Sequence, residues 1–224
     1  MKRRVIITSD GSTTIQIEDW EEQYHSKHGA IQEAYHVFIK HGLSLFKKGE
    51  SVSILEIGFG TGLNALVTRI EAEKQNLKID YKGVEAYPIA KEELRQLNYI
   101  KELKAETYQN DFLLMHSAPW EENLVLSASF RLFKEQKDFL NIEDKNLYNL
   151  IYFDAFGARV QPELWTEAIF AKMHAALKYK GVLVTYSAKG SVRRVMQAVG
   201  FKVERLPGPP GKREMLRAIK TIEE

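Results

Sequence analysis

One glycine-rich stretch has the residue types of an anion-binding turn. It reads Ile54-Leu55-Glu56-Ile57-Gly58-Phe59-Gly60-Thr61-Gly62-Leu63-Asn64. The apolar run over residues 51–57 predicts a buried strand, and apolar residues at helical spacing predict a helix over 64–75. Free backbone N–H groups in the first turn of such a helix can bind a negatively charged group. Glycines let that group approach the backbone closely.

The spacing of the glycines excludes two common nucleotide sites. The third glycine of a dinucleotide-binding fingerprint would fall at position 63, which is leucine, and no Lys-Ser/Thr pair follows as in a phosphate-binding P-loop. The acid-x-Gly-x-Gly-x-Gly pattern instead resembles motif I of the Rossmann-like S-adenosylmethionine (SAM) methyltransferases. The resemblance implies that the helix N-terminus binds the methionine carboxylate of SAM and that Glu56 faces its amino group.

Strand and helix patterns alternate through the rest of the chain. Further strands are predicted at 79–85, 127–134, 148–153, 182–186, 201–206 and 214–219. This order predicts an α/β fold with a mostly parallel, seven-stranded, doubly wound sheet that ends in an antiparallel hairpin, the pattern of class I SAM-dependent methyltransferases. We expect one domain over 1–224, in which a hairpin and helix (1–50) form a small N-terminal cap on the Rossmann-like core (51–224).

Acidic residues follow four of the predicted strands, namely Glu56, Glu85, Asp138 and Asp154. Ligands of open α/β sheets bind beyond the carboxyl ends of the strands, so four acids at these ends predict a site there. Glu85 is suited to accept hydrogen bonds from both ribose hydroxyls, and Asp138 to accept one from an adenine amino group. Each acid alone could equally be a helix N-cap or a solvated turn residue.

Asp154 has the residue type and position for a role in the reaction itself. Methyl transfer requires the nucleophile to be aligned with the methyl group, and an amine must be unprotonated when it attacks. A carboxylate beside the amine can orient it and accept a proton. We therefore expect Asp154 to be the catalytic residue.

Three further segments resemble one family of tRNA-modifying enzymes. They are residues 151–165 (Ile-Tyr-Phe-Asp-Ala-Phe-Gly-Ala-Arg-Val-Gln-Pro-Glu-Leu-Trp), 189–194 (Lys-Gly-Ser-Val-Arg-Arg) and 207–216 (Pro-Gly-Pro-Pro-Gly-Lys-Arg-Glu-Met-Leu). These segments are similar to the MnmD-type enzymes and to the methyltransferase half of the bifunctional MnmC proteins. The resemblance implies methyl transfer from SAM to 5-aminomethyl(-2-thio)uridine at the wobble position of tRNA, giving 5-methylaminomethyluridine.

The resemblance also implies which residues bind SAM and the substrate. The expected SAM-binding residues are Glu56, Gly58, Phe59, Gly60, Gly62, Asn64, Glu85, Asp138 and Asp154. Tyr24, His25 and Phe156 are candidate substrate residues, although packing within the cap is an equally good interpretation of the first two. Relatives often have Ala-Pro after this Phe, where this chain has Gly157-Ala158-Arg159. The fused relatives carry an FAD-dependent oxidoreductase half, and we expect this chain to lack that flavin step.

Charge is distributed unevenly along the chain. Residues 178–220 contain eleven Lys or Arg and two acids, so this stretch carries +9 and the remainder −7, for a net charge of +2. A basic C-terminal third indicates a polyanionic partner, and the resemblance makes this partner tRNA, contacted in its unpaired anticodon loop. The candidate phosphate contacts are Lys189, Arg193, Arg194, Lys212 and Arg213.

Composition narrows the remaining possibilities. The chain has no cysteine, and its histidines lack metal-ligand spacing, so no metal site is expected. The apolar run after the basic N-terminus is too short for a signal peptide or a membrane span, and we expect a cytoplasmic protein. Alternative functions are methylation of a small-molecule amine, aminopropyl transfer on a similar fold, and RNA binding without catalysis. Retention of the glycines and of Asp154 argues against the last.

Overall fold

Eight strands form the large sheet of the computed structural model, which describes residues 2–221. In spatial order they are β10 (Phe201–Pro207), β11 (Glu214–Lys220), β9 (Leu177–Thr185), β8 (Tyr148–Phe153), β4 (Ser51–Ile57), β5 (Lys78–Glu85), β7 (Phe130–Gln136) and β6 (Asn123–Ser127). The five strands from β9 to β7 run parallel, whereas the β9–β11, β10–β11 and β6–β7 pairs are antiparallel. The predicted Rossmann-like α/β fold with a C-terminal hairpin is confirmed.

The prediction of seven strands was wrong by one, because β6 adds an edge strand that the sequence pattern did not indicate. Leu124 and Leu126 pack against the core, while Val125 between them is 64% exposed. Three consecutive apolar residues hide this inside–outside alternation, which is the usual signal of a half-buried strand. The two strands form a hairpin with an irregular register near Ser127, so the sequence suggested one strand where the chain makes two.

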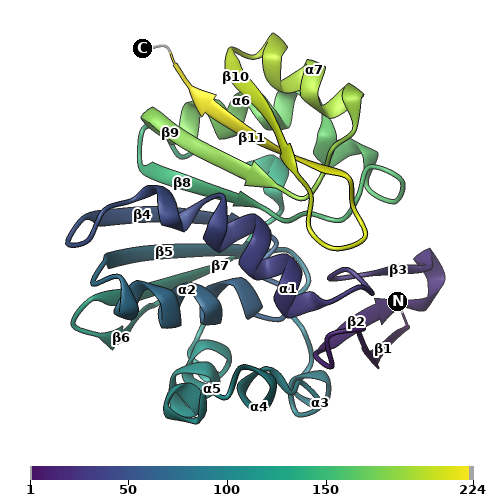
Figure 1. Cartoon of the computed structure of the whole chain (residues 1–224), viewed down its shortest axis with the longest axis vertical. Coiled ribbons are helices and arrows are strands. Elements are labelled where there is room, and N and C mark those ends of the chain that lie inside the picture. Colours follow the sequence, from purple (N-terminus) through teal and green to yellow (C-terminus); the bar gives the residue numbers. More distant parts are fainter. Residues whose placement is uncertain (1, 222–224) are drawn as a thin grey trace.

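Helices cover the large sheet on both faces (Figure 1). One face carries α1 (Ala30–Ala34), which continues as a π-helix over Tyr35–Lys40, together with α2 (Leu63–Lys74), α4 (Tyr99–Leu103) and α5 (Gln109–Ser117). The other face carries α6 (Glu167–Ala176) and α7 (Gly190–Ala198). Short helical segments complete the description: α3 (Lys91–Leu94) and 3-10 turns at Glu18–Trp20, Leu43–Leu45, Glu106–Tyr108, Phe139–Asn141 and Pro162–Trp165.

A second, small antiparallel sheet is formed by β1 (Arg3–Ile7), β2 (Thr13–Ile17) and β3 (Glu22–Gln23). It lies to one side of the large sheet, as Figure 1 shows. Asn98 fastens it to the core, since its side chain accepts a hydrogen bond from the Thr13 N–H (2.8 Å) and donates one to the Gly11 carbonyl (2.9 Å). The N-terminal segment is therefore held by specific polar contacts to the chain that follows β5.

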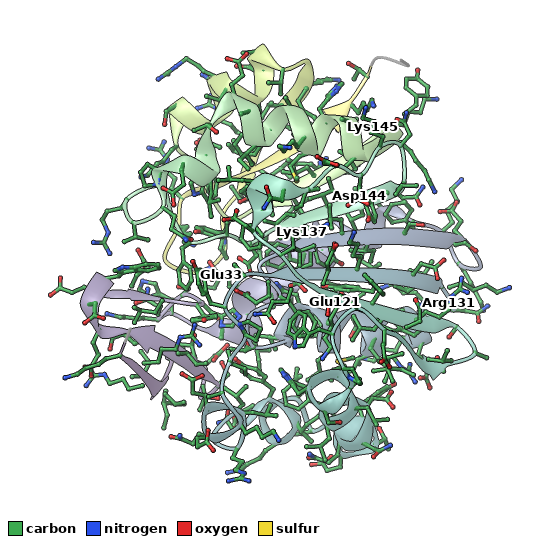
Figure 2. All side chains as sticks on the ribbon, turned by 180° about the vertical axis from the view of Figure 1, so that it is seen from behind. Glu33, Glu121, Arg131, Lys137, Asp144 and Lys145 are labelled. Carbon is green, nitrogen blue, oxygen red and sulfur yellow. The ribbon has the colours of Figure 1, made fainter. Side chains whose placement is uncertain are left out.

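Charged side chains lie on the rear of the large sheet, away from these contacts (Figure 2). Arg131 pairs with Asp80 (2.6 Å), and Lys82 pairs with Asp144 (3.1 Å). Arg131 and Lys145 lie near the amino-terminal ends of parallel strands β7 and β8. They are at the edge of the sheet opposite to the one where ligands of such folds bind, and they serve below as controls.

Candidate active site

A cavity of about 550 Å³ lies at the carboxyl ends of the parallel strands. Its volume falls within the range of roughly 300 to 1,000 Å³ that is usual for small-molecule sites. The glycine-rich turn and strand ends form one wall, and the N-terminal segment and the β10–β11 loop form the other. The residues used below that line it are Tyr24, His25, Glu33, Gly58, Phe59, Gly60, Asn64, Glu85, Asp138, Asp154, Phe156, Tyr186 and Lys212.

The glycine-rich turn lies very close to two of its neighbours in the cavity, the backbone of Asp154 and the ring of Tyr24. Gly58 has φ +92°, and a Cβ there would lie 2.8 Å from the carbonyl oxygen of Asp154. A Cβ on Gly60 would lie 2.9 Å from the ring of Tyr24. A side chain at either position would collide with its neighbour, so these contacts require glycine. Gly62, which was also expected to bind SAM, precedes α2 but does not line the cavity.

Asn64, in the first turn of α2, connects two of the predicted acids. Its Nδ2 group donates to Glu56 Oε1 and to Asp154 Oδ2, each at 2.9 Å. Glu56 is fully buried behind Asn64 and does not line the cavity. The expectation that Glu56 faces the ligand directly therefore needs correction: Asn64 lines the cavity, and Glu56 lies behind it as the acceptor of its amide hydrogen bond.

Both acids are held where ionisation is unfavourable. Burial raises the pKa of Glu56 well above its ordinary value, although the hydrogen bond from Asn64 opposes this. Burial also raises the pKa of Asp154 well above its ordinary value, reinforced by the negative charge of Glu33 and opposed by Asn64 and by the cation of Lys212. Asp154 is thus a carboxyl group with enhanced proton affinity at the end of a ligand-sized cavity, which suits a proton acceptor.

Glu85 is fixed at the end of β5 by two backbone N–H groups. Its Oε2 accepts from Gly60 and its Oε1 accepts from Tyr87, both at 2.9 Å. A carboxylate has about four acceptor positions, so capacity for further donors remains. Glu85 therefore keeps the acceptor capacity that a ribose diol would require, and its contact with the ribose stays a prediction.

Asp138 has the capping role that was the alternative interpretation of an acid at a strand end, and its contact with adenine stays a prediction. Its Oδ1 accepts from the Leu140 N–H at 2.8 Å and caps the 3-10 turn Phe139–Asn141. The side chain is exposed and lines the cavity. The geometry leaves its other carboxylate oxygen available for a donor group of a ligand.

The loop after Asp154 packs against the N-terminal segment. The ring of Phe156 makes edge contacts with Tyr24 (centroids 4.9 Å apart) and Trp20 (5.5 Å). Arg159 donates to the Trp20 carbonyl (2.9 Å) and pairs with Glu22 (3.1 Å). The loop over residues 156–159 is therefore held by the N-terminal segment, which closes the cavity on this side.

His25 is buried and held within the N-terminal cap, unlike Tyr24, the other cap residue expected at the site. It is 8% exposed, and its Nδ1 lies 3.0 Å from the hydroxyl of Thr14. Burial lowers its pKa to about 4, so the imidazole is neutral at pH 7. Its ring is fixed by Thr14 within the cap. Tyr24, whose ring covers Gly60, has the more direct contact with the glycine-rich turn.

The basic residues expected at the surface divide into two groups. Lys189, Arg194 and Arg213 are exposed and Arg193 is partly exposed, on or beside α7 and in the β10–β11 loop. Lys212 instead points into the cavity, where its Nζ donates to Glu33 Oε1 at 2.6 Å. The expectation that Lys212 contacts phosphate on an open surface is therefore corrected.

Two residues of this site were missed in the sequence, Glu33 and Tyr186. Glu33 lies on α1, is 6% exposed, and its Oε2 accepts from the Ser26 N–H at 2.8 Å. Figure 2 shows it between the small sheet and the large one. An acid among apolar residues on a helix was the available signal. Tyr186, which follows β9, donates from its hydroxyl to the Ala155 carbonyl at 2.8 Å.

Two classes of feature are absent within residues 2–221. No group of three or more His, Cys, Asp or Glu in this range is arranged to hold a metal ion. Over the same range no helix has the length and apolar character needed to cross a bilayer.

Comparison with known proteins identifies the class to which this fold and site belong. A family model described as S-adenosyl-L-methionine-dependent methyltransferase matches residues 95–221. The structure of MnmC2 from Aquifex aeolicus superposes with a TM-score of 0.78 at 26% identity, covering 97% of this chain and 69% of that one. Spermidine synthase from Thermotoga maritima superposes with a TM-score of 0.54 at 15% identity, covering 98% of this chain and 74% of that one. It shares the fold alone.

Relatives similar over nearly the whole chain carry one name, tRNA 5-methylaminomethyl-2-thiouridine biosynthesis bifunctional protein MnmC. The protein of Leptospira interrogans is 28% identical over 94% of this chain and 34% of its own length. The protein of Aromatoleum aromaticum is 30% identical over 96% of this chain and 35% of its own length. The chain thus spans about a third of the length of these curated relatives.

The sheet order and the strand-end cavity define a Rossmann-like class I methyltransferase. Within this class, the chain belongs to the S-adenosyl-L-methionine-dependent methyltransferase family whose model it matches. Its cofactor is SAM.

The residues of the cavity fit this cofactor. The glycines leave space where a Cβ would stand, and Glu85 retains acceptor capacity for hydroxyl groups. Asp138 has a carboxylate oxygen available for a ligand donor, and Asn64 and Asp154 provide polar groups next to the glycine-rich turn. We expect Gly58, Phe59, Gly60 and Asn64 to hold the amino acid end, and Glu85 and Asp138 the nucleoside end.

Proposed function

We propose that this chain transfers a methyl group from SAM to the exocyclic amine of 5-aminomethyl(-2-thio)uridine at the wobble position of tRNA, giving 5-methylaminomethyluridine. The similarity to MnmC proteins over almost the entire chain supports the substrate class. The single structural observation that carries the proposal is Asp154, a carboxyl group of raised pKa held by Asn64 at the end of a SAM-sized cavity. Because the acceptor is tRNA, the proposal places the protein in the cytoplasm.

The cavity residues account for the chemistry of an amine acceptor. SAM supplies an electrophilic methyl group on a sulfonium. The acceptor nitrogen forms the new N–C bond, and the C–S bond breaks with its electron pair left on sulfur. Asp154 orients the amine through its carboxylate and accepts the proton that the nitrogen must lose, while Asn64 fixes the carboxylate. The aromatic residues Tyr24 and Phe156 exclude water beside it.

The proposal favours a nucleic acid over a polyamine as the acceptor. An aminopropyltransferase binds a polycation, and this cavity does contain acids, but Lys212 places an ammonium group at the end beside Asp154, where the acceptor must bind. Lys189 and Arg194, at and in α7, and Arg213, in the β10–β11 loop, are exposed basic residues outside the cavity. Such residues contact phosphates and position an RNA without reading its sequence. An anticodon loop presents an unpaired base that is extruded at low cost.

Replacing Arg193 and Arg194 together with alanine should weaken tRNA binding about tenfold at moderate salt. The slope of log affinity against log salt should fall by about 1.5, because each phosphate contact contributes about 0.7 to 0.9. Filter binding of tRNA at several salt concentrations measures both quantities. The double variant of Arg131 and Lys145, at the opposite edge of the sheet, removes the same charge and should leave the slope unchanged (Figure 2). Equal slopes for both double variants would exclude α7 from the tRNA surface.

The proposed function is tested by methyl transfer from labelled SAM to tRNA purified from cells that accumulate 5-aminomethyluridine. Nucleoside mass spectrometry of the product should show a new 5-methylaminomethyluridine peak. SAM binding without any transfer to this tRNA would overturn the proposed acceptor and indicate a small-molecule amine instead.

A further inference from the structure

An ion pair crosses the end of the cavity beside Asp154, which we call the acceptor end because the proposed amine acceptor binds there. Lys212 Nζ lies 2.6 Å from Glu33 Oε1 and 3.9 Å from the centre of the Tyr186 ring. Glu33 is fixed in turn by the Ser26 N–H, and Tyr186 by its hydrogen bond to the Ala155 carbonyl. The lysine ammonium group is therefore anchored on two sides by groups that are themselves held in place.

The charged groups around this ammonium come from every wall of the acceptor end. Asp154 follows β8, Tyr186 follows β9, and Glu33 belongs to α1. The cap contributes His25, whose pKa responds to Glu33, Asp10 and Lys212, and Glu22, which acts on Tyr186. His28 packs against Gly211, beside Lys212. His25 is neutral at pH 7, so Glu33 and Lys212 are the charges that act on the Asp154 carboxyl, and the buried Glu56 carboxyl adjoins it through the Asn64 amide that both acids share.

This arrangement bears on the protonation state of an amine acceptor. A primary alkylamine is mostly protonated at neutral pH, and a protonated amine has no electron pair with which to attack. Two carboxyl groups alone, Asp154 and Glu33, would stabilise the ammonium form. A fixed cation nearby has the opposite effect, because two positive charges in a site of low dielectric repel each other.

We propose that Lys212 is a positioning residue whose ammonium group, anchored by Glu33 and Tyr186, makes the acceptor amine bind at Asp154 as the free base. The inference rests on the proposed amine methylation and deepens it by assigning charge selection to the same site. The incoming ammonium gives one proton to water as it binds, which leaves the Asp154 carboxylate to accept the second proton, lost by the nitrogen after attack. After N–C bond formation the secondary ammonium product experiences the same repulsion, which favours loss of its proton and release.

The test is the pH dependence of methyl transfer at saturating SAM and tRNA, comparing wild type with Lys212→Met. Methionine keeps much of the length and apolar stem of lysine but removes the charge. We expect the midpoint of the rising limb to move upward by about one pH unit. The rate at pH 7 should fall about tenfold and recover most of its loss near pH 9. Lys212→Arg retains the charge and should retain the wild-type midpoint.

Further variants separate this role from a structural one. Glu33→Gln removes a negative charge but keeps an acceptor for the Ser26 N–H, and it should move the midpoint to lower pH. Lys145→Met, on the rear of the sheet, should leave the profile unchanged. A merely structural Lys212 would lower the rate equally at all pH values, and an unchanged midpoint or parallel loss in Lys212→Met would overturn the inference.

Failure of the proposed function would look different from failure of this inference. If wild type itself transfers no methyl group to tRNA at any pH between 6 and 9.5, the acceptor is wrong. If wild type is active and Lys212→Met has the wild-type midpoint of the pH–rate profile, the proposed acceptor is retained and the proposed role of Lys212 is excluded. The SAM dissociation constant and the melting temperature of each variant, measured alongside, should match wild type and show that the cavity is intact.

Discussion

Replacing Asp154 with asparagine is expected to lower the rate of methyl transfer by about 10²- to 10⁴-fold while SAM still binds, because the variant cannot accept the proton of the amine. Asparagine keeps the size of the side chain and, through its carbonyl oxygen, an acceptor for the Asn64 Nδ2 group, now 2.9 Å away. Single-turnover transfer to tRNA measures the chemical step, and calorimetry measures SAM affinity. The carboxylate alone is changed, so the loss should appear in the rate of the chemical step.

A matched acid-to-amide change separates this effect from a general one. Asp144 pairs with Lys82 on the rear of the sheet, outside the cavity (Figure 2). Asp144→Asn should transfer methyl groups within about twofold of wild type. Near wild-type turnover by Asp154→Asn would remove this residue from the catalytic role and leave positioning alone to account for the reaction.

The elements that the sequence predicted best are those specified by local pattern. The strand–turn–helix unit around Gly58 is determined by an apolar run, three glycines and an apolar helical face, all within about 25 residues. Its neighbour β5 alternates polar and apolar residues before a buried end at Glu85, and its other neighbour β8 is an almost continuous apolar run followed directly by an acid. Burial on both faces makes such strands easy to recognise, and the carboxyl ends of parallel strands must meet at one edge.

The acceptor end of the cavity was less predictable because its residues are far apart in the chain. Glu33 and Lys212 are separated by 179 positions, and neither has a local motif that indicates an ion pair. Lys212 was counted among surface charges because its neighbours in sequence are basic and glycine-rich. Only the return of the β10–β11 loop over the cavity, through contacts such as the 2.8 Å hydrogen bond between His36 and the Pro207 carbonyl, brings it to α1.

Contacts between side chains from different elements also explain why the position predicted for Glu56 relative to the cavity was wrong. The position of an acid at a strand end predicts that it lies near the ligand, but it does not say which side chain lies between them. Asn64 is eight residues further along, in the first turn of α2, and its amide reaches across to both acids. Side-chain direction at this scale depends on how the helix sits on the sheet, and the sequence pattern contains that information only indirectly.

Substitution of Gly58 by alanine is expected to damage both cofactor binding and catalysis, with a loss of about 100-fold in catalytic efficiency. The added Cβ would lie 2.8 Å from the carbonyl oxygen of Asp154, and a backbone atom cannot rotate away as a flexible side chain could. Hydrogen bonds hold both sides of the contact: Gly58 N–H donates to the Val84 carbonyl (3.0 Å) and Asp154 N–H to the Ile57 carbonyl (2.9 Å). Relief of the collision must therefore shift Asp154 or the turn.

Gly49 provides a control for the backbone strain that this substitution also introduces. Its φ is +87°, close to the +92° of Gly58, but a Cβ there would meet no atom within 4 Å. Alanine at either position costs about 1 kcal/mol or more of stability, since L-residues disfavour positive φ. If Gly49→Ala loses stability but keeps activity while Gly58→Ala loses both, the collision with Asp154 is responsible. Equal activity of the two variants would mean that the turn adapts, and that close approach at Gly58 does not set the position of the catalytic carboxylate.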